Sequence, residues 1–170
     1  MATPTVQDET ARSYQAPMNT QFSVFLDNKV GKLLELVDAI DGEDLRIVAL
    51  SVMDAADHAV VRMVTSREAL ARKLLTKQKL PFSEADILIV ELNPQVGRTL
   101  SFLCKTLLAA ELNIHYAYPL MVRPHGAATI ALHTDDQIFS GQILRRKQFT
   151  LLGENDLLDQ FHGGDPFDSD

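Results

Sequence analysis

Hydrophobic and polar positions follow two different periods along this chain, and the same succession occurs twice. In the first half, apolar runs of strand length lie at 21–26, 45–53 and 59–64. Apolar residues at helical spacing follow the first and the third of these runs. A short run at 82–85 closes this half. The pattern therefore predicts the order strand, helix, strand, strand, helix, strand.

The predicted helices each carry apolar residues on one face. In the first helix these residues recur at i, i+3, i+4 and i+7: Leu33, Leu36, Val37 and Ile40. The same spacing returns later in the chain with Leu100, Leu103, Cys104 and Leu107. The other two helices open with capping-box sequences at Thr65 and Thr134. The residues predicted to face inward are Leu70, Ala71, Leu74 and Leu75 in the earlier helix, and Phe139, Ile143 and Leu144 in the later one.

The second half repeats the order, with a strand starting at Ile87 and further strands at 112–122, 127–132 and 149–152. The repeated order predicts an α+β fold of two ferredoxin-like βαββαβ units in tandem, each an antiparallel sheet with its helices on one face. We assign the chain to four segments, which are a disordered lead (1–19), unit 1 (20–84), unit 2 (85–158) and an acidic mobile tail (159–170).

One stretch organises both units. Phe22 to Leu33 and Ile87 to Leu100 each join an apolar run to a polar turn that closes on Val-Gly-(Lys or Arg) before a helix. A glycine suits such a turn because it adopts positive φ without a steric cost. Free amides at the start of the helix would then point outward with the positive end of the helix dipole, which favours a carboxylate or phosphate.

Composition and charge narrow the range of partners. The net charge of -7 argues against nucleic acid as the main partner, because phosphate binding calls for a basic face. No apolar run has the roughly 20 residues that span a bilayer. The N-terminal residues lack the apolar core of a signal peptide, so we expect a cytoplasmic protein without membrane contact. The single cysteine, Cys104, fits a reducing compartment and is predicted to be a small buried hydrophobe.

The sequence offers little catalytic chemistry. Its five histidines and one cysteine have no zinc-ligand spacing, so we expect neither a metal nor a cofactor. Nucleotide-binding glycine motifs and a nucleophile elbow are absent from the sequence. Aspartate pairs such as Asp54 with Asp57, and Asp135 with Asp136, are typical of turns and helix caps. An enzyme on a ferredoxin-like scaffold stays open as a hypothesis, but the sequence favours a non-catalytic protein.

The duplicated strand-loop-Gly-helix segment, with the second strands Leu45–Ser51 and Leu112–Tyr118, resembles a tandem pair of ACT domains. Members of that family usually bind a free amino acid between two units, held by the loop before the first helix and by the second strand of the paired unit. Carried over, the resemblance implies a first loop site of Asp27, Asn28, Val30, Gly31 and Lys32 and a second of Asn93, Val96, Gly97 and Arg98. The paired strands would offer Val48, Ala49 and Leu50, or His115, Tyr116 and Ala117.

The resemblance implies a regulator of amino-acid metabolism, similar to the small regulatory subunits of acetolactate synthase. A branched-chain amino acid is then the first ligand to consider, and a homodimer or an amino-acid biosynthetic enzyme the first partner. The family often has proline before the loop glycine, where this chain has Val30 and Val96. That difference motivates the alternative of an interaction module that has kept the fold and lost the ligand.

Overall fold

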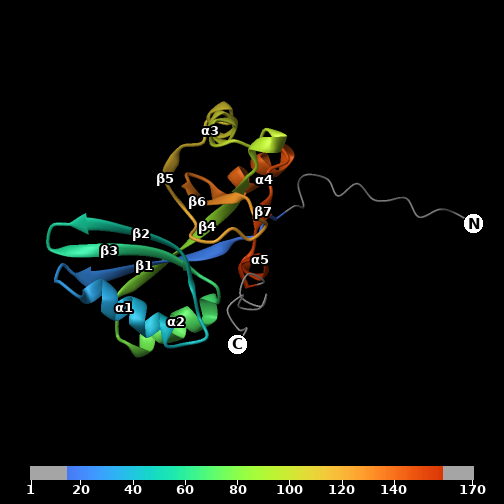
Figure 1. The fold of residues 1–170 in the computed structure, drawn as a ribbon. Coiled ribbons are helices and arrows are strands. Elements are labelled where there is room, and N and C mark those ends of the chain that lie inside the picture. The colour runs from blue at the N-terminus through green and yellow to red at the C-terminus, as the bar shows by residue number, and fades with distance from the viewer. Residues whose placement is uncertain (1–14, 159–170) are drawn as a thin grey trace, which may run out of the picture.

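The computed structural model describes residues 15–158, so the predicted tail and residues 1–14 of the predicted lead lie outside the described residues. The chain forms the predicted order of strands and helices twice, which confirms the α+β, tandem ferredoxin-like fold (Figure 1). The first five elements are β1 (Asn19–Asp27), α1 (Lys32–Asp41), β2 (Ile47–Ala55), β3 (His58–Thr65) and α2 (Glu68–Lys77). The later elements are β4 (Phe82–Leu92), the short 3-10 helix η1 (Pro94–Val96), α3 (Leu100–Ala109), β5 (Ile114–Pro119), β6 (Ala128–Thr134), α4 (Gln137–Arg146), β7 (Leu151–Leu152) and α5 (Glu154–Leu158).

Strand β4 belongs to both units. Its first part pairs with β1, from Phe82 to Ile87, and its second part pairs with β6, from Leu88 to Leu92. The prediction of a short strand at 82–85 that ends before a new strand begins was therefore wrong, and the proposed boundary between residues 84 and 85 falls inside one strand of 11 residues. Polar residues in the first part do not break the strand, because one of its faces is open to solvent.

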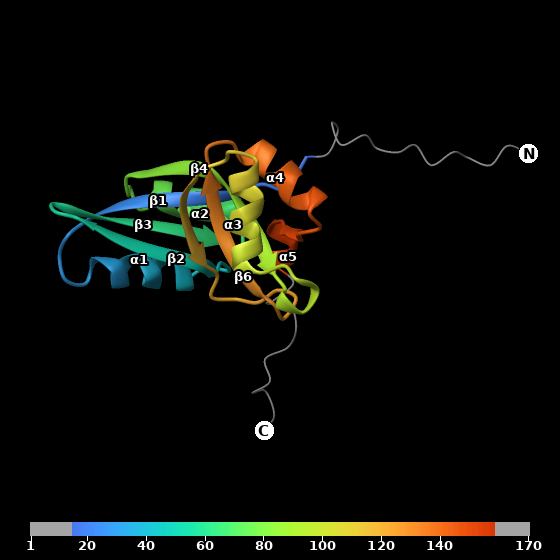
Figure 2. The ribbon, with the colours of Figure 1, turned by 90° about the horizontal axis from the view of Figure 1, so that it is seen from above.

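All strands lie in one antiparallel seven-stranded sheet of order β2-β3-β1-β4-β6-β5, with β7 added beside β4. The sheet curls until its two outer strands meet. Ala49 of β2 forms a bridge with Leu120, and the Met121 amide donates to the Val48 carbonyl at 2.8 Å. As a result α1 and α2 cover one side of the molecule while α3 and α4 cover another, and the remaining sheet faces turn toward each other (Figure 2).

Three hydrophobic cores follow from this arrangement. One lies under α1 and α2 and is built around Phe22 and Met63, and another lies under α3 and α4 around Leu88 and Leu103. The third joins the units and contains Ile89 of β4 together with residues from β2, β3, β5, β6, β7 and α5. Two units of this size each bury only a limited core alone, so the shared core is a major source of stability.

Two helix predictions need correction. Cys104 is exposed, because α3 turns Leu103 and Leu107 inward and leaves Leu100 and Leu108 outside with the cysteine. Apolar residues lie on most of the surface of α3, so helical spacing alone is compatible with more than one buried face. The packing in the folded chain determines which face is buried. In α4, the buried positions are Ser140, Gly141 and Leu144, whereas the predicted Phe139 is largely exposed.

The capping predictions also differ from the structure. Helix α2 begins three residues after Thr65. Its first amide, at Glu68, donates a hydrogen bond to the carboxylate of Glu154 from α5 at 2.9 Å. Unit 2 therefore caps a helix of unit 1. Near Thr134, Asp136 is the N-cap of α4 and Gln137 accepts the Thr134 amide at 3.3 Å.

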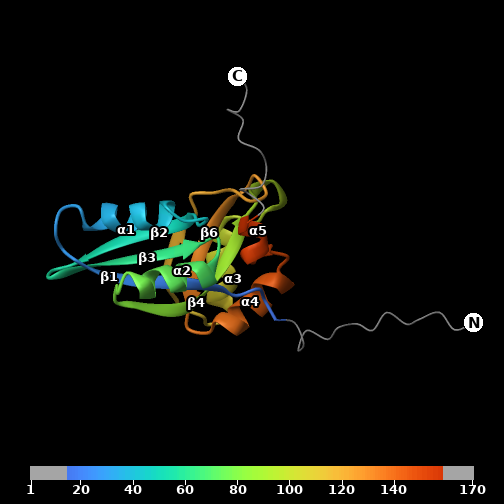
Figure 3. The same ribbon diagram turned by 90° about the horizontal axis from the view of Figure 1, so that it is seen from below.

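The last residues of the predicted lead are packed rather than free. Ala16 and Met18 contact the core of unit 2. Gly141 of α4 lets Ala16 approach so closely that a Cβ on residue 141 would lie 2.5 Å from the Ala16 Cβ. The described part of the chain thus starts on unit 2 before it enters β1 of unit 1 (Figure 3).

Candidate ligand site

The first loop, between β1 and α1, is open, and Asn28 attaches it to the β2-β3 hairpin. Gly31 is the N-cap of α1 with φ +89°, and nothing lies within 4 Å of the position where a Cβ would be. The Asn28 side chain donates to the Asp54 carboxylate at 3.0 Å, which fixes the loop to the turn between β2 and β3. The φ of Gly31 is one that other residues adopt only at a steric cost, which explains the glycine found in the sequence.

Four amides around this helix start are unpaired. Within residues 15–158, no acceptor meets the amides of Val30, Gly31, Leu33 and Leu34. The first bond of the helix runs from the Glu35 amide to the Gly31 carbonyl at 3.0 Å, and the Lys32 amide reaches Lys29 at 3.3 Å. The positive end of α1 is therefore available to an anion, as the sequence predicts.

The second loop is closed by its own hydrogen bonds. The Val96 and Arg98 amides donate to the Asn93 carbonyl at 3.3 and 2.9 Å, and the Gly97 amide donates to Pro94 at 3.1 Å. The expectation of free amides here was wrong. The extra residue of this copy is accommodated by η1, after which Thr99, rather than the glycine, caps α3.

Arg98 is also occupied. Its guanidinium donates to the Gln148 side chain at 3.0 Å and to the Gln148 carbonyl at 3.2 Å, and it lies over the rings of Phe102 and Phe149. These contacts tie the second loop to the end of α4. The two copies of the loop thus differ, because the first presents open amides while the second is a structural connection.

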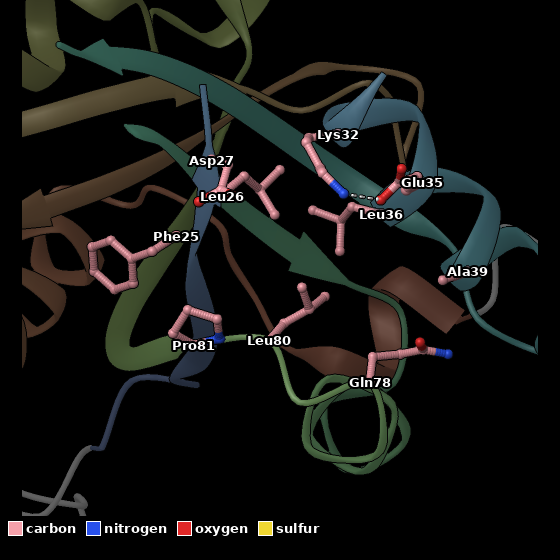
Figure 4. A pocket seen from close by; sticks show the side chains of 10 residues that line it. All are labelled: Phe25, Leu26, Asp27, Lys32, Glu35, Leu36, Ala39, Gln78, Leu80 and Pro81. Carbon is pink, nitrogen blue, oxygen red and sulfur yellow. Dashed lines mark hydrogen bonds and ion pairs between the residues drawn. The ribbon is translucent and has the colours of Figure 1, made fainter. Parts of the chain in front are cut away.

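A pocket of about 380 Å³ lies beside the first loop, between α1, the end of β1 and the connection from α2 to β4 (Figure 4). Its polar side chains include Lys32 and Glu35, whose Nζ and Oε2 atoms are 2.8 Å apart. The hydrogen bond from Lys32 to Glu35, helped by the carboxylate charge, raises the pKa of Lys32. The full lining is Phe25, Leu26, Asp27, Lys32, Glu35, Leu36, Ala39, Gln78, Leu80 and Pro81.

The structure unites only part of the predicted site. Asp27 and Lys32 line the pocket, but the second strands do not reach it within one chain. Val48 and Ala49 are fully buried in the core between the units, and Leu50 packs on the core of unit 1. On β5, His115 and Ala117 are exposed and Tyr116 packs at the edge of the inter-unit core.

Several lining residues were not anticipated from the sequence. Glu35 had a detectable signal, because a lysine and a glutamate three positions apart on a helix are placed to pair. No sequence signal marked Gln78, Leu80 and Pro81. They join the site only because α2 packs beside α1. Among residues 15–158, no group of three or more potential ligands is arranged to hold a metal ion, and no helix is long and apolar enough to cross a membrane.

The duplicated βαββαβ order, the shared strand and the loop before the first helix of each unit define a tandem of two small α+β modules. A family model, the ACT domain pair, matches residues 18–160. The chain therefore belongs to the ACT domain pair family, which confirms the resemblance.

Comparison with solved structures supports the same fold. Protein BT0572 from Bacteroides thetaiotaomicron is 24% identical, with a TM-score of 0.73 over 84% of this chain and 97% of that chain. The regulatory subunit of aspartate kinase from Thermus thermophilus, in a ligand-free form, is 7% identical, with a TM-score of 0.51 over 78% of this chain and 92% of that chain. A comparison with curated protein sequences gave no match.

Proposed function

We propose that this protein is a non-catalytic regulator that binds a free amino acid in the pocket beside the first loop. The main observation in support is the difference between the two loops, because the first has unpaired amides beside a pocket whereas the amides of the second are hydrogen-bonded within the loop. Lys32 lines this pocket, and the unpaired amides belong to residues on either side of it.

The charges of the pocket suit a zwitterion. An α-carboxylate needs a cation or amide donors, which Lys32 and the start of α1 supply. An α-ammonium needs a carboxylate, which Glu35 supplies. In the unliganded chain these two side chains pair with each other, so an amino acid would exchange one ion pair for two.

The remaining wall of the pocket combines aliphatic side chains with the polar groups of Asp27 and Gln78. Leu26, Leu36, Leu80 and Pro81 offer aliphatic surface. An aliphatic, branched-chain amino acid therefore suits this surface, and it fits better than an acidic one, whose carboxylate would meet that of Asp27. A regulatory role of the acetolactate synthase small-subunit type, exerted through an amino-acid biosynthetic enzyme in the cytoplasm, agrees with this ligand.

The test is a thermal titration of the purified protein with each of the twenty amino acids. A ligand present at 100 times its Kd stabilises a folded protein by about 2.7 kcal/mol. We expect one aliphatic amino acid to raise the Tm, and Gly31→Ala and Lys32→Gln to abolish the rise. Gly97→Ala is the matched control for the glycine, since both have positive φ, and Lys29→Gln is the matched control for the charge.

A flat response from folded wild-type protein would favour the alternative, an interaction module without a ligand. The closed second loop, together with the exposed Val30 and Leu34 beside the first, is the observation behind that alternative. A response that disappears in Gly97→Ala but persists in Gly31→Ala would contradict the choice of loop.

The free edge of β2 supports a homodimer. From Leu50 to Ala55, no described strand pairs with its outer side, and Val52 is half exposed. An unpaired edge of this kind readily adds the equivalent strand of a second copy. We expect sedimentation equilibrium to give a dimer for wild type and for the exposed control Ile138→Lys, but a monomer for Val52→Lys. A monomeric wild type would contradict this assembly.

A further inference from the structure

Three rows of side chains cross the face of the β2-β3-β1 sheet that is turned toward unit 2. Cross-strand partners in an antiparallel sheet share a face, so the register defines each row. The inner row, buried under unit 2, is Ala49, Val64 and Gln21. The polar row, half buried, is Ser51, Arg62 and Ser23. The outer row, at the open end, is Met53, Val60 and Phe25.

Arg62, at the centre of the polar row, has a guanidinium without an anionic partner. Its carbon lies 4.2 Å from the centre of the Tyr116 ring of unit 2. Among residues 15–158, no hydrogen bond or ion pair reaches this guanidinium. A guanidinium has five N–H donors, and in a half-buried position their best acceptor is a carboxylate or phosphate held by two parallel bonds.

The unit 2 side of Arg62 leaves that positive charge uncompensated. Tyr116 stacks on His133 at 4.9 Å, and His133 lies 5.4 Å from His115. Burial, followed by the charges of His115 and Arg62, lowers the pKa of His133, so this ring is neutral at pH 7. The nearest carboxylate of the stack, Asp135, is bound to His115 and to the Asn113 amide.

We propose that the polar row binds the carboxylate of a small organic acid whose apolar body lies on the outer row. Arg62 provides the paired donors, and the hydroxyls of Ser51 and Ser23 stand on either side of it. Phe25 and Met53 are 37% and 43% exposed, so apolar surface continues directly from the polar row. The ring of Tyr116 forms the wall on the unit 2 side.

This site and the pocket beside the first loop share Phe25, but their charged residues lie apart. Along β1, side chains alternate between the faces, and Phe25 and Leu26 point to opposite sides of the strand (Figure 4). The core under α1 and α2 takes Leu26, whereas Phe25 belongs to the outer row. A carboxylate at Arg62 therefore lies on another face of the strand from Lys32 and Glu35, and Phe25 is the residue that the two sites have in common.

The probe for this site is 3-phenylpropanoate, which joins a carboxylate to an apolar body. Acetate tests the carboxylate alone, and 3-phenylpropan-1-ol tests the apolar body alone. Inorganic phosphate tests the alternative anion. We expect calorimetry to show binding of 3-phenylpropanoate, weaker binding of the three partial probes, and shifted ring resonances of Tyr116 and His133. Arg62→Gln should weaken the Kd for 3-phenylpropanoate by about tenfold or more, because bonds to a charged group are lost.

Two further variants keep the test decisive if Arg62→Gln folds poorly. Ser51→Ala removes one hydroxyl and should weaken binding several-fold, while Arg67→Gln removes an exposed arginine paired with Asp44 and should change nothing. Equal binding of 3-phenylpropanoate to wild type and Arg62→Gln would overturn the proposal. So would phosphate binding as tight as 3-phenylpropanoate, or resonance shifts confined to the residues around Lys32.

Discussion

Ile89→Ala is expected to lower the free energy of unfolding by about 2–5 kcal/mol, the range for truncating a fully buried aliphatic side chain. Ile89 is 0% exposed and belongs to the core between the units, on the strand that both units share. The loss should therefore affect the whole chain in one step. Denaturant unfolding should show a single transition at a lower midpoint with an unchanged slope.

Hydrogen exchange distinguishes a shared loss from a local one. Amides of β3 in unit 1 and of β6 in unit 2 should lose protection to the same extent in Ile89→Ala. Ser83→Ala, at an exposed position on the same strand, is the control and should change stability by no more than about 0.5 kcal/mol. Two separate transitions, or loss of protection in unit 2 alone, would contradict the view that β4 joins the units into one cooperative body.

The sequence predicts the fold well because the buried residues of its elements are apolar. The apolar run around Val60 and the period of 3.6 around Leu36 and Leu74 record that burial directly, and the duplication confirms each assignment. The continuity of β4 could not be predicted, because polar residues around Glu84 resemble a turn when their solvent-exposed face is unknown. The curling of the sheet was also hidden, since apolar spacing shows that a face is buried but not what covers it.

The site was only partly predictable, for a different reason. A glycine such as Gly31 marks a loop with positive φ, and that signal is local. Whether the loop amides are free depends on backbone hydrogen bonds, and the single extra residue before α3 was enough to close the second loop around Asn93. Arg62 is visible in the sequence as a charge inside an apolar strand. Its lack of an anionic partner could not be predicted, because it follows from the position of Tyr116 in the other unit.

Tyr118 should make the protein unusually sensitive to alkaline pH. The side chain is 6% exposed, and its hydroxyl donates to the side-chain oxygen Oε1 of Gln21 at 2.6 Å. Gln21 is itself buried and donates from its Nε2 to Tyr116 at 2.8 Å. Burial, reinforced by Tyr116 and opposed by Arg62, raises the pKa of Tyr118 well above its ordinary value. A phenolate here would also lose the proton that Gln21 accepts.

The sign of the pH dependence follows from proton uptake. The unfolded chain releases the Tyr118 proton near pH 10, while the folded chain retains it, so the folded state binds more protons above that pH. The free energy of unfolding should then fall by about 1.4 kcal/mol per pH unit above about pH 10 through this group. At neutral pH, where tyrosine is protonated in both states, this linkage contributes nothing.

Tyr118→Phe separates this effect from the titration of other groups. The variant should be less stable at neutral pH by about 1–3 kcal/mol, because the buried oxygen of Gln21 loses its donor. Its stability should nevertheless fall less steeply than that of wild type above about pH 10, since the linked proton is gone. Tyr116→Phe, at a half-buried ring, is the control and should keep the steep fall. Denaturant titrations across the alkaline range measure both slopes, and parallel curves for wild type and Tyr118→Phe would show that Tyr118 ionises in the folded chain as it does in the unfolded one.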